Sequence, residues 1–167
     1  ILAGVGGAKE LLPRASNYLQ DCINEIRSLT KRLSAPTLGK ISLEESIEDL
    51  IESINQTSKV KIVSQIAGLN NRILKNDLHI GIYRILQEHL TNILKHAAAS
   101  LVHVTLESFV GSVQLRVKDN GKGFDPQKQF GGIGIANMVA RAESLKGKLV
   151  IKSAPTKGCE LFVMVPL

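Results

Sequence analysis

Four polar side chains recur on one face of a predicted helix in the middle of the chain. Glu88, Asn92 and His96 are spaced four residues apart, and Lys95 lies beside His96. Residues four apart remain on the same side of an α-helix. Carboxylate and amide oxygens suit Mg²⁺, and an ammonium group donates charge-assisted hydrogen bonds to phosphate oxygens. The cluster therefore indicates a magnesium–polyphosphate site, and a solvated helix face is the alternative that the same pattern allows.

A glycine-rich stretch follows the predicted strand 113–118 and begins with the run DNGKG at positions 119–123. A carboxylate at a strand end can accept a hydrogen bond from an exocyclic amine such as that of adenine, and the two glycines leave room for a flat base. An Asn-Gly β-turn is the alternative, which the run FDP at 124–126 disfavours because it does not begin a partner strand. A second cluster, GGIG at 131–134, precedes a predicted helix whose N-terminal amides would meet phosphate.

Motifs of several other site classes are absent from the sequence. There is no P-loop, no complete dinucleotide fingerprint, no H-E-x-x-H metal motif and no G-x-S-x-G nucleophile elbow. Cys22 and Cys159 are far apart and belong to no C-x-x-C pair, so their spacing suggests neither zinc nor a disulfide framework. A reducing compartment fits this cysteine usage.

The composition is that of one globular domain with a small appendage, because the chain has 167 residues, 44% of them hydrophobic and 22% charged. The net charge of +6 suits either general solubility or an anionic ligand. Aromatic residues make up 4% and Trp is absent, which argues against a stacking platform for nucleic acid. No apolar run is long enough to span a membrane. The first residues resemble a cut inside a larger protein, and we expect a cytoplasmic domain without direct membrane contact.

Hydrophobic periodicity predicts helices and strands in an α+β order. Ser42 and Glu45 form a capping box that should begin a helix ending near Asn55. The other predicted helices cover 10–33, 76–99 (with Asn76 or Asp77 as N-cap) and 135–145, and the predicted strands cover 60–67, 101–107, 113–118, 148–153 and 160–165. In the helix 76–99 the expected buried stripe is Ile82, Ile85, Leu86, Leu90, Ile93, Leu94 and Ala97. Hairpins flanked by helices favour helices on one face of a mainly antiparallel sheet.

Three of these stretches together resemble bacterial sensor histidine kinases. The run from Glu88 to Ala97 is similar to the N box of that family, the run 119–123 to its G1 box, and the run 132–135 to its G2 box, in the order and spacing of the family. The short loop between the glycine boxes points to the nitrate-sensor-like subgroup. The resemblance implies a Bergerat-type two-layer α/β sandwich, as in GHKL ATPases, at 37–167. It also implies a partial dimerisation and phosphoacceptor helical segment at 1–36.

The resemblance also implies a role for each matching residue. Glu88 and Asn92 would be catalytic, with Asn92 ligating Mg²⁺ and Glu88 acting either as a base or only to orient the metal shell. Lys95 and His96 would contact the phosphates of ATP, and Asp119 would bind the adenine amino group. The glycines of the pocket and its lid would be Gly121, Gly123, Gly132 and Gly134. Cys159 stands where many members have Thr, and we leave it outside the core site.

The implied function is transfer of the ATP γ-phosphate to a histidine and onward to the receiver domain of a response regulator. None of the four histidines has the acidic context of a phosphoacceptor, so that histidine is expected to lie outside these 167 residues. We expect the N-terminal helix either to form a homodimer or to fold onto its own domain. Other readings are a different GHKL ATPase, an anti-sigma serine kinase and a nucleotide-binding scaffold without kinase activity. A nucleic-acid binder ranks last.

Overall fold

The fold is taken from a computed structural model, which describes residues 41–69, 74–126 and 133–167. The predicted helix 10–33 lies outside the described residues. In chain order the elements are helix α2 (Leu43–Thr57), strand β1 (Lys61–Ala67), helix α3 (Asn76–Asn92), π-helix η1 (Ile93–Ala97), strands β2 (Leu101–Phe109) and β3 (Ser112–Asp119), helix α5 (Ile133–Ser144), and strands β4 (Lys148–Ser153) and β5 (Cys159–Pro166). Every helix and strand predicted within the described residues is present.

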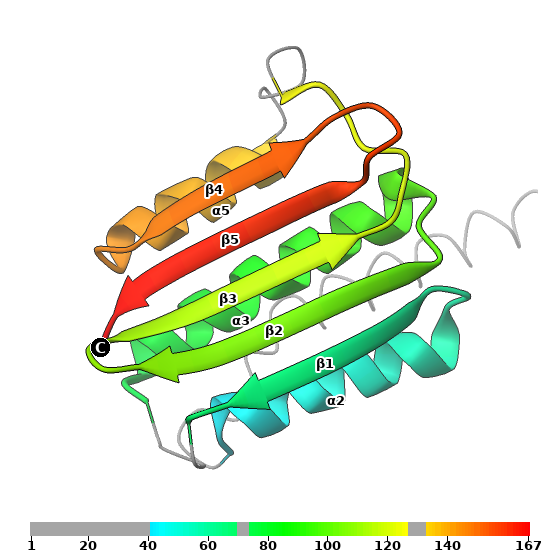
Figure 1. The fold of residues 1–167 in the computed structure, drawn as a ribbon. Coiled ribbons are helices and arrows are strands. Elements are labelled where there is room, and N and C mark those ends of the chain that lie inside the picture. Colours follow the sequence, from blue (N-terminus) through cyan, green and yellow to red (C-terminus); the bar gives the residue numbers. More distant parts are fainter. Residues whose placement is uncertain (1–40, 70–73, 127–132) are drawn as a thin grey trace, which may run out of the picture. The chain divides into compact units, whose positions relative to one another are not determined.

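The five strands form one mixed sheet in the order β1-β2-β3-β5-β4 (Figure 1). β1 runs parallel to β2, and every other neighbouring pair is antiparallel. Parallel neighbours cannot be joined by a hairpin, so the chain crosses from β1 to β2 through α3. The predicted α+β class with a mainly antiparallel sheet is confirmed.

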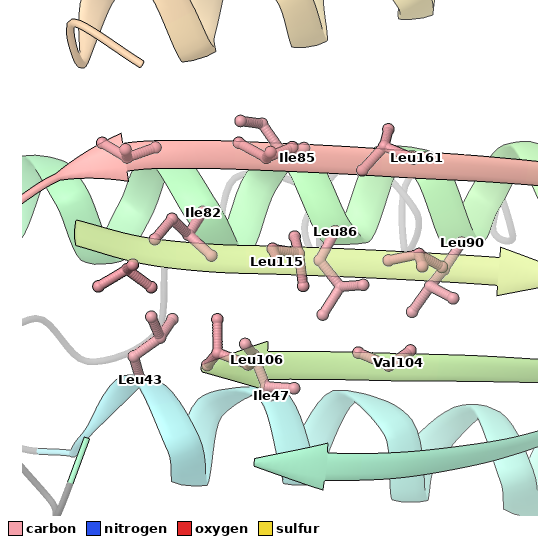
Figure 2. Close-up of a cluster of buried hydrophobic side chains, with 14 of the residues drawn as sticks. Leu43, Ile47, Ile82, Ile85, Leu86, Leu90, Val104, Leu106, Leu115 and Leu161 are labelled. Carbon is pink, nitrogen blue, oxygen red and sulfur yellow. The ribbon is translucent and has the colours of Figure 1, made fainter. Parts of the chain in front are cut away.

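One face of the sheet carries the helices. Alternate residues of the central strands are buried, and they share a single core with residues of α2, α3 and α5. Figure 2 shows Ile47 of α2 beside Leu106 of β2, and Leu86 and Ile85 of α3 along β3 and β5. The intervening strand positions point the other way: Arg116 and Glu160 form an ion pair there. The fold is thus a two-layer sandwich with one helix-covered face.

The start of α2 follows its predicted capping box. The Ser42 hydroxyl accepts a hydrogen bond from the Glu45 N–H at 3.2 Å, and the Glu45 carboxylate accepts one from the Ser42 N–H at 2.7 Å. Ser46, one turn further, lies 2.9 Å from the ring nitrogen Nε2 of His79. This buried polar pair connects α2 to α3, and burial lowers the pKa of His79.

Helix α3 differs from its prediction at both ends. Its N-cap is Lys75, which makes no side-chain capping bond, so the expectation of Asn76 or Asp77 as N-cap is wrong. At its other end the chain widens into the π-helix η1 after Asn92. The wider turn changes the side-chain period, and Leu94, expected in the buried stripe, is 41% exposed. No helix among residues 41–69, 74–126 and 133–167 has both the length and the apolar character needed to cross a membrane.

Candidate functional site

A cavity of about 550 Å³ opens at one end of the central strands, where β3 ends and β5 begins. The C-terminal end of α3 lies at the same end of the sheet (Figure 1). Inward-facing positions of β3 are Val113, Leu115 and Val117, and the same alternation turns Asp119 toward the helices. Cys159 is the first inward-facing residue of β5, because Lys118 pairs with Glu160. Asp119 and Cys159 therefore follow the buried apolar residues at this end of the helix-covered face.

Asp119 is the most buried carboxylate among the described residues, with 3% of its surface exposed. Its Oδ1 atom accepts a hydrogen bond from the Gly121 N–H at 2.7 Å, and its Oδ2 atom has no partner within the protein. Burial raises the pKa of Asp119, and hydrogen bonds from the backbone of Gly121 and Cys159 oppose that shift. A buried acceptor without a donor is costly, so Oδ2 is suited to a donor that a ligand brings.

The loop after Asp119 is tied to the elements around it. Asn120 Oδ1 accepts hydrogen bonds from the N–H groups of Ser100 and Leu101, at 2.9 and 3.0 Å. The Lys122 N–H donates to the Ala97 carbonyl at 2.8 Å, which joins the loop to the last turn of η1. These bonds position the predicted adenine-binding run against the predicted metal-binding helix.

Gly121 and Gly123 are required by close approach of the backbone. A Cβ atom on Gly121 would overlap the carbonyl oxygen of Ala97, and one on Gly123 would overlap that of Ala154. Gly123 also has a φ of +61°, which L-residues rarely adopt. The sequence assigned both glycines to the pocket, and Gly123 does line the cavity.

Only some of the predicted helix residues of the site face the cavity. Asn92 and His96 line the cavity, as does His89 one turn earlier. Lys95 is exposed and does not line the cavity. Glu88 is also outside the cavity lining: its Oε1 atom lies against Gly134, at the start of α5, where an added Cβ would overlap it. The four predicted polar residues thus do not all face one space: Asn92 and His96 line the cavity, whereas Glu88 and Lys95 do not.

The cavity includes residues that sequence reasoning did not place in the site. Ile93, Met138 and Ile151 supply apolar walls, and Lys122 supplies a cation. His89 could have been found from the sequence, since it falls on the buried stripe of α3 between Leu86 and Leu90, where a polar residue is unusual. Cys159, left outside the core site above, lines the cavity. Gly134 lines it too, and Gly132 lies outside the described residues.

Two further groups in the cavity have strongly perturbed acidity. Burial lowers the pKa of His89 to about 4, so its ring is neutral at pH 7. Burial also raises the pKa of the Cys159 thiol to about 12, and the neighbouring Asp119 charge adds to the effect. Perturbed groups that converge in one apolar cavity are typical of a binding or active site.

Sequence comparison agrees with the architecture. Residues 77–167 match the family described as histidine kinase-, DNA gyrase B- and HSP90-like ATPase, and the chain belongs to this family. Among curated relatives it is 28% identical over 165 residues to the signal transduction histidine-protein kinase/phosphatase DegS of Brevibacillus brevis, covering 98% of this chain and 42% of DegS. It is 31% identical over 157 residues to the sensor protein VraS of Staphylococcus epidermidis, covering 93% of this chain and 44% of VraS. The chain therefore spans less than half the length of these relatives.

Solved structures support the same fold. The blue-light activated histidine kinase of Erythrobacter litoralis EL346 aligns with a TM-score of 0.72 at 21% identity, covering 86% of this chain and 50% of that chain. The histidine kinase domain from the same protein aligns with a TM-score of 0.62 at 22% identity, covering 80% of this chain and 65% of that chain. The fold class expected from the sequence is thereby confirmed.

Proposed function

We propose that this chain is the Mg-ATP-binding catalytic domain of a two-component sensor histidine kinase. The observation that carries the proposal is the unpartnered Oδ2 atom of Asp119, buried at the end of a cavity that also reaches Asn92. The cavity volume of about 550 Å³ falls within the range of small-molecule sites. Family membership and the resemblance to DegS and VraS support the same assignment.

The adenine end of the site is assigned to Asp119. Its free oxygen would accept a hydrogen bond from the exocyclic amine, while Ile93, Met138 and Ile151 would contact the faces of the base. A buried acceptor rejects ligands that lack the donor, because it is then left without a partner. The geometry therefore favours adenine over guanine, which carries a carbonyl at the corresponding position.

We assign the phosphate end of the site to Asn92, His96 and Lys122. Asn92 offers an oxygen ligand for Mg²⁺, which would neutralise phosphate charge when bound. Lys122 and His96 line the same cavity and would donate hydrogen bonds to phosphate oxygens. Lys95 and Gly132 remain proposed phosphate and lid residues on the strength of the sequence motifs alone.

Catalysis in this proposal rests on positioning and charge neutralisation. The bond between the γ-phosphorus and its bridging oxygen breaks, a phosphorus–nitrogen bond forms on a histidine outside these residues, and ADP leaves. The receiver domain of a response regulator then accepts the phosphoryl group. Glu88 lies against Gly134 instead of lining the cavity, so we assign it a positioning role and not that of a base that activates water. Segment 1–36 is the proposed dimerisation surface.

Calorimetric titration of ATP in the presence of Mg²⁺ tests the binding part of the proposal. We expect a dissociation constant between micromolar and millimolar, or roughly −8 to −4 kcal/mol. Asp119→Asn should weaken binding at least about tenfold, since it removes a charged acceptor. Asp77→Asn makes the same change on the exposed start of α3 and should bind ATP as the wild type does. Equal affinities of the two variants would contradict the adenine assignment.

Radiolabelled ATP tests the transfer part. The chain is incubated with a histidine-bearing dimerisation hairpin of a sensor kinase supplied in trans. We expect label on that hairpin that is stable to alkali and labile to acid, as phosphohistidine is. Label with the opposite stability would indicate a serine kinase, release of free phosphate alone would indicate an ATPase, and binding without turnover would indicate a scaffold. Each of these three outcomes would overturn the kinase assignment.

A further inference from the structure

Three side chains of different chemistry converge at the floor of the cavity. His89 comes from α3, Asp119 from the end of β3 and Cys159 from the start of β5, and all three are buried. One ligand atom from each, a ring nitrogen, a carboxylate oxygen and the thiol sulfur, lies within 4.8 Å of the other two. The spacing of the cysteines in the sequence did not indicate this cluster, because His89, Asp119 and Cys159 are 30 and 40 residues apart along the chain.

Two of the three side chains have buried polar atoms with no partner in the protein. His89 Nε2 and Asp119 Oδ2 make no hydrogen bond, and their residues are 5% and 3% exposed. Buried polar atoms are nearly always paired, so two neighbouring exceptions at one cavity indicate a missing ligand. The proposed adenine amine would satisfy Asp119, and it leaves His89 Nε2 without a partner, whereas the Cys159 thiol has a hydrogen bond with the Ser153 side chain.

We propose that His89, Asp119 and Cys159 form a binding site for a borderline-soft divalent transition metal of the Zn²⁺ or Co²⁺ type. A nitrogen, an oxygen and a sulfur ligand are the donor set that such ions select, whereas Mg²⁺ selects oxygen ligands. Tetrahedral Zn²⁺ places its ligand atoms roughly 3.5 Å apart, so the three groups need to close by only about 1 Å. Because all three residues line the cavity, the fourth ligand would be a water molecule that enters from it.

Binding at this site exchanges protons for the ion. The Cys159 sulfur–hydrogen bond breaks, the sulfur–metal bond forms, and the proton leaves to solvent, since a thiol that coordinates a metal is deprotonated. His89 binds as the neutral ring. The thiolate and the Asp119 carboxylate together compensate the two positive charges, so the loaded site is electrically neutral in a buried environment.

Metal and nucleotide should exclude each other, and this step rests on the proposed function. The Asp119 oxygen that would accept the adenine amine is the one that would ligate the ion. An ion held between Asp119, His89 and Cys159 also occupies the floor of the cavity, where the base would lie. The site is therefore inhibitory: a transition metal would compete with ATP, and Mg²⁺ alone would not.

Titration of Co²⁺ into the full chain, reduced and free of nucleotide, tests the site directly. We expect tetrahedral visible bands and a near-ultraviolet band from thiolate-to-cobalt charge transfer, which Zn²⁺ should bleach and Mg²⁺ should not. Cys159→Ser should abolish the charge-transfer band, and His89→Ala should weaken Co²⁺ binding at least about tenfold. The matched controls are Cys22→Ser, which removes the other thiol, and His103→Ala, on an exposed position of β2. Both controls should keep the wild-type spectrum.

The outcomes are distinct even if a variant fails to fold. A cooperative melting transition establishes folding of each variant, and Zn²⁺ should raise the melting temperature of the wild type and of Cys22→Ser but not of Cys159→Ser. Absence of a charge-transfer band in the wild type, or its loss in Cys22→Ser with retention in Cys159→Ser, would overturn the site. A cavity that holds only water would give the first of these results.

Adding Mg-ATP to the Co²⁺-loaded chain tests the exclusion. We expect the charge-transfer band to disappear as ATP displaces the ion. Persistence of the band with ATP bound would overturn the exclusion. Binding of Mg-ATP without any Co²⁺ site would leave the proposed function standing and remove the metal site, while a Co²⁺ site without ATP binding would do the reverse.

Discussion

His89 is a neutral histidine inside the domain, and this has a consequence for stability in acid. Its pKa is lowered to about 4 by burial, against 6.5 in the unfolded chain. Below pH 6.5 this histidine binds a proton in the unfolded chain but not in the folded one. Its contribution to the free energy of unfolding is therefore full above pH 6.5 and is lost as the pH falls toward 4. Between about pH 7 and about pH 4.5 the loss is about 2 kcal/mol.

The comparison that isolates this effect is His89→Leu. Denaturant unfolding at several pH values should show the wild type losing about 2 kcal/mol more than this variant over that interval. Asp119 acts in the opposite direction, because burial raises its pKa, and it is present in both proteins. His103→Leu, at an exposed position, should retain the acid sensitivity of the wild type. The same acid sensitivity in His89→Leu would show that the ring is not held neutral.

Residue roles were predictable where a local rule fixed the direction of a side chain. Asp119 follows the inward alternation of β3, so its burial could be derived from the strand pattern alone. Asn92 and His96 were found from helical spacing, and Lys95 was grouped with them although it is outside the cavity lining. The convergence of His89 with Cys159 could not be derived, because it depends on how β5 pairs with β3.

At the level of elements, two glycines of the site should respond differently to the same substitution. In Gly121→Ala the new methyl group would meet the backbone carbonyl of Ala97, which is fixed by its bond from Lys122. In Gly134→Ala it would meet the ends of two side chains, overlapping the flexible Glu88 carboxylate and lying at ordinary contact distance from the Asn92 amide. We expect Gly121→Ala to lower the free energy of unfolding by about 1–3 kcal/mol.

Gly134→Ala is the matched control, since it lies in the first turn of α5. There alanine is a better helix former than glycine, and the free energy of unfolding should change by less than about 1 kcal/mol in either direction. Denaturant titration measures both values. A larger loss in Gly134→Ala than in Gly121→Ala would mean that Glu88 is held rigidly against α5.

The elements themselves were predictable to within a few residues wherever periodicity and caps agreed. The capping box of Ser42 and Glu45 located the start of α2. The π-helix η1 was not predictable, because its residues, Ile93–Ala97, are ordinary helix formers with no proline or glycine to mark a change. It ends at Ala98, whose φ of +51° turns the chain toward β2, and Ala97 receives the bond from Lys122. The wider turn is therefore accompanied by a hydrogen bond from a residue distant in sequence, which the local sequence does not indicate.

The fold class of the domain followed from the order of its elements, and the pairing of its strands did not. A parallel β1–β2 pair and the insertion of β5 between β3 and β4 are choices that periodicity cannot distinguish. They matter for function, since they bring the ends of β3 and β5 together under α3. The site therefore belongs to the folded domain and to no single segment of it.

A ligand that joins these elements should stabilise the domain as a unit. Mg-ATP that binds the folded chain only, at about 100 times its dissociation constant, should add about 2.7 kcal/mol to the free energy of unfolding. For a domain of this size that corresponds to a rise in melting temperature of roughly 8 °C. Removing Mg²⁺ with a chelator should remove most of the rise, because the phosphate charge would then lack the ion that neutralises it. Asp119→Asn should show little rise at the same nucleotide concentration, and an undiminished rise in that variant would place the stabilising contact outside the cavity.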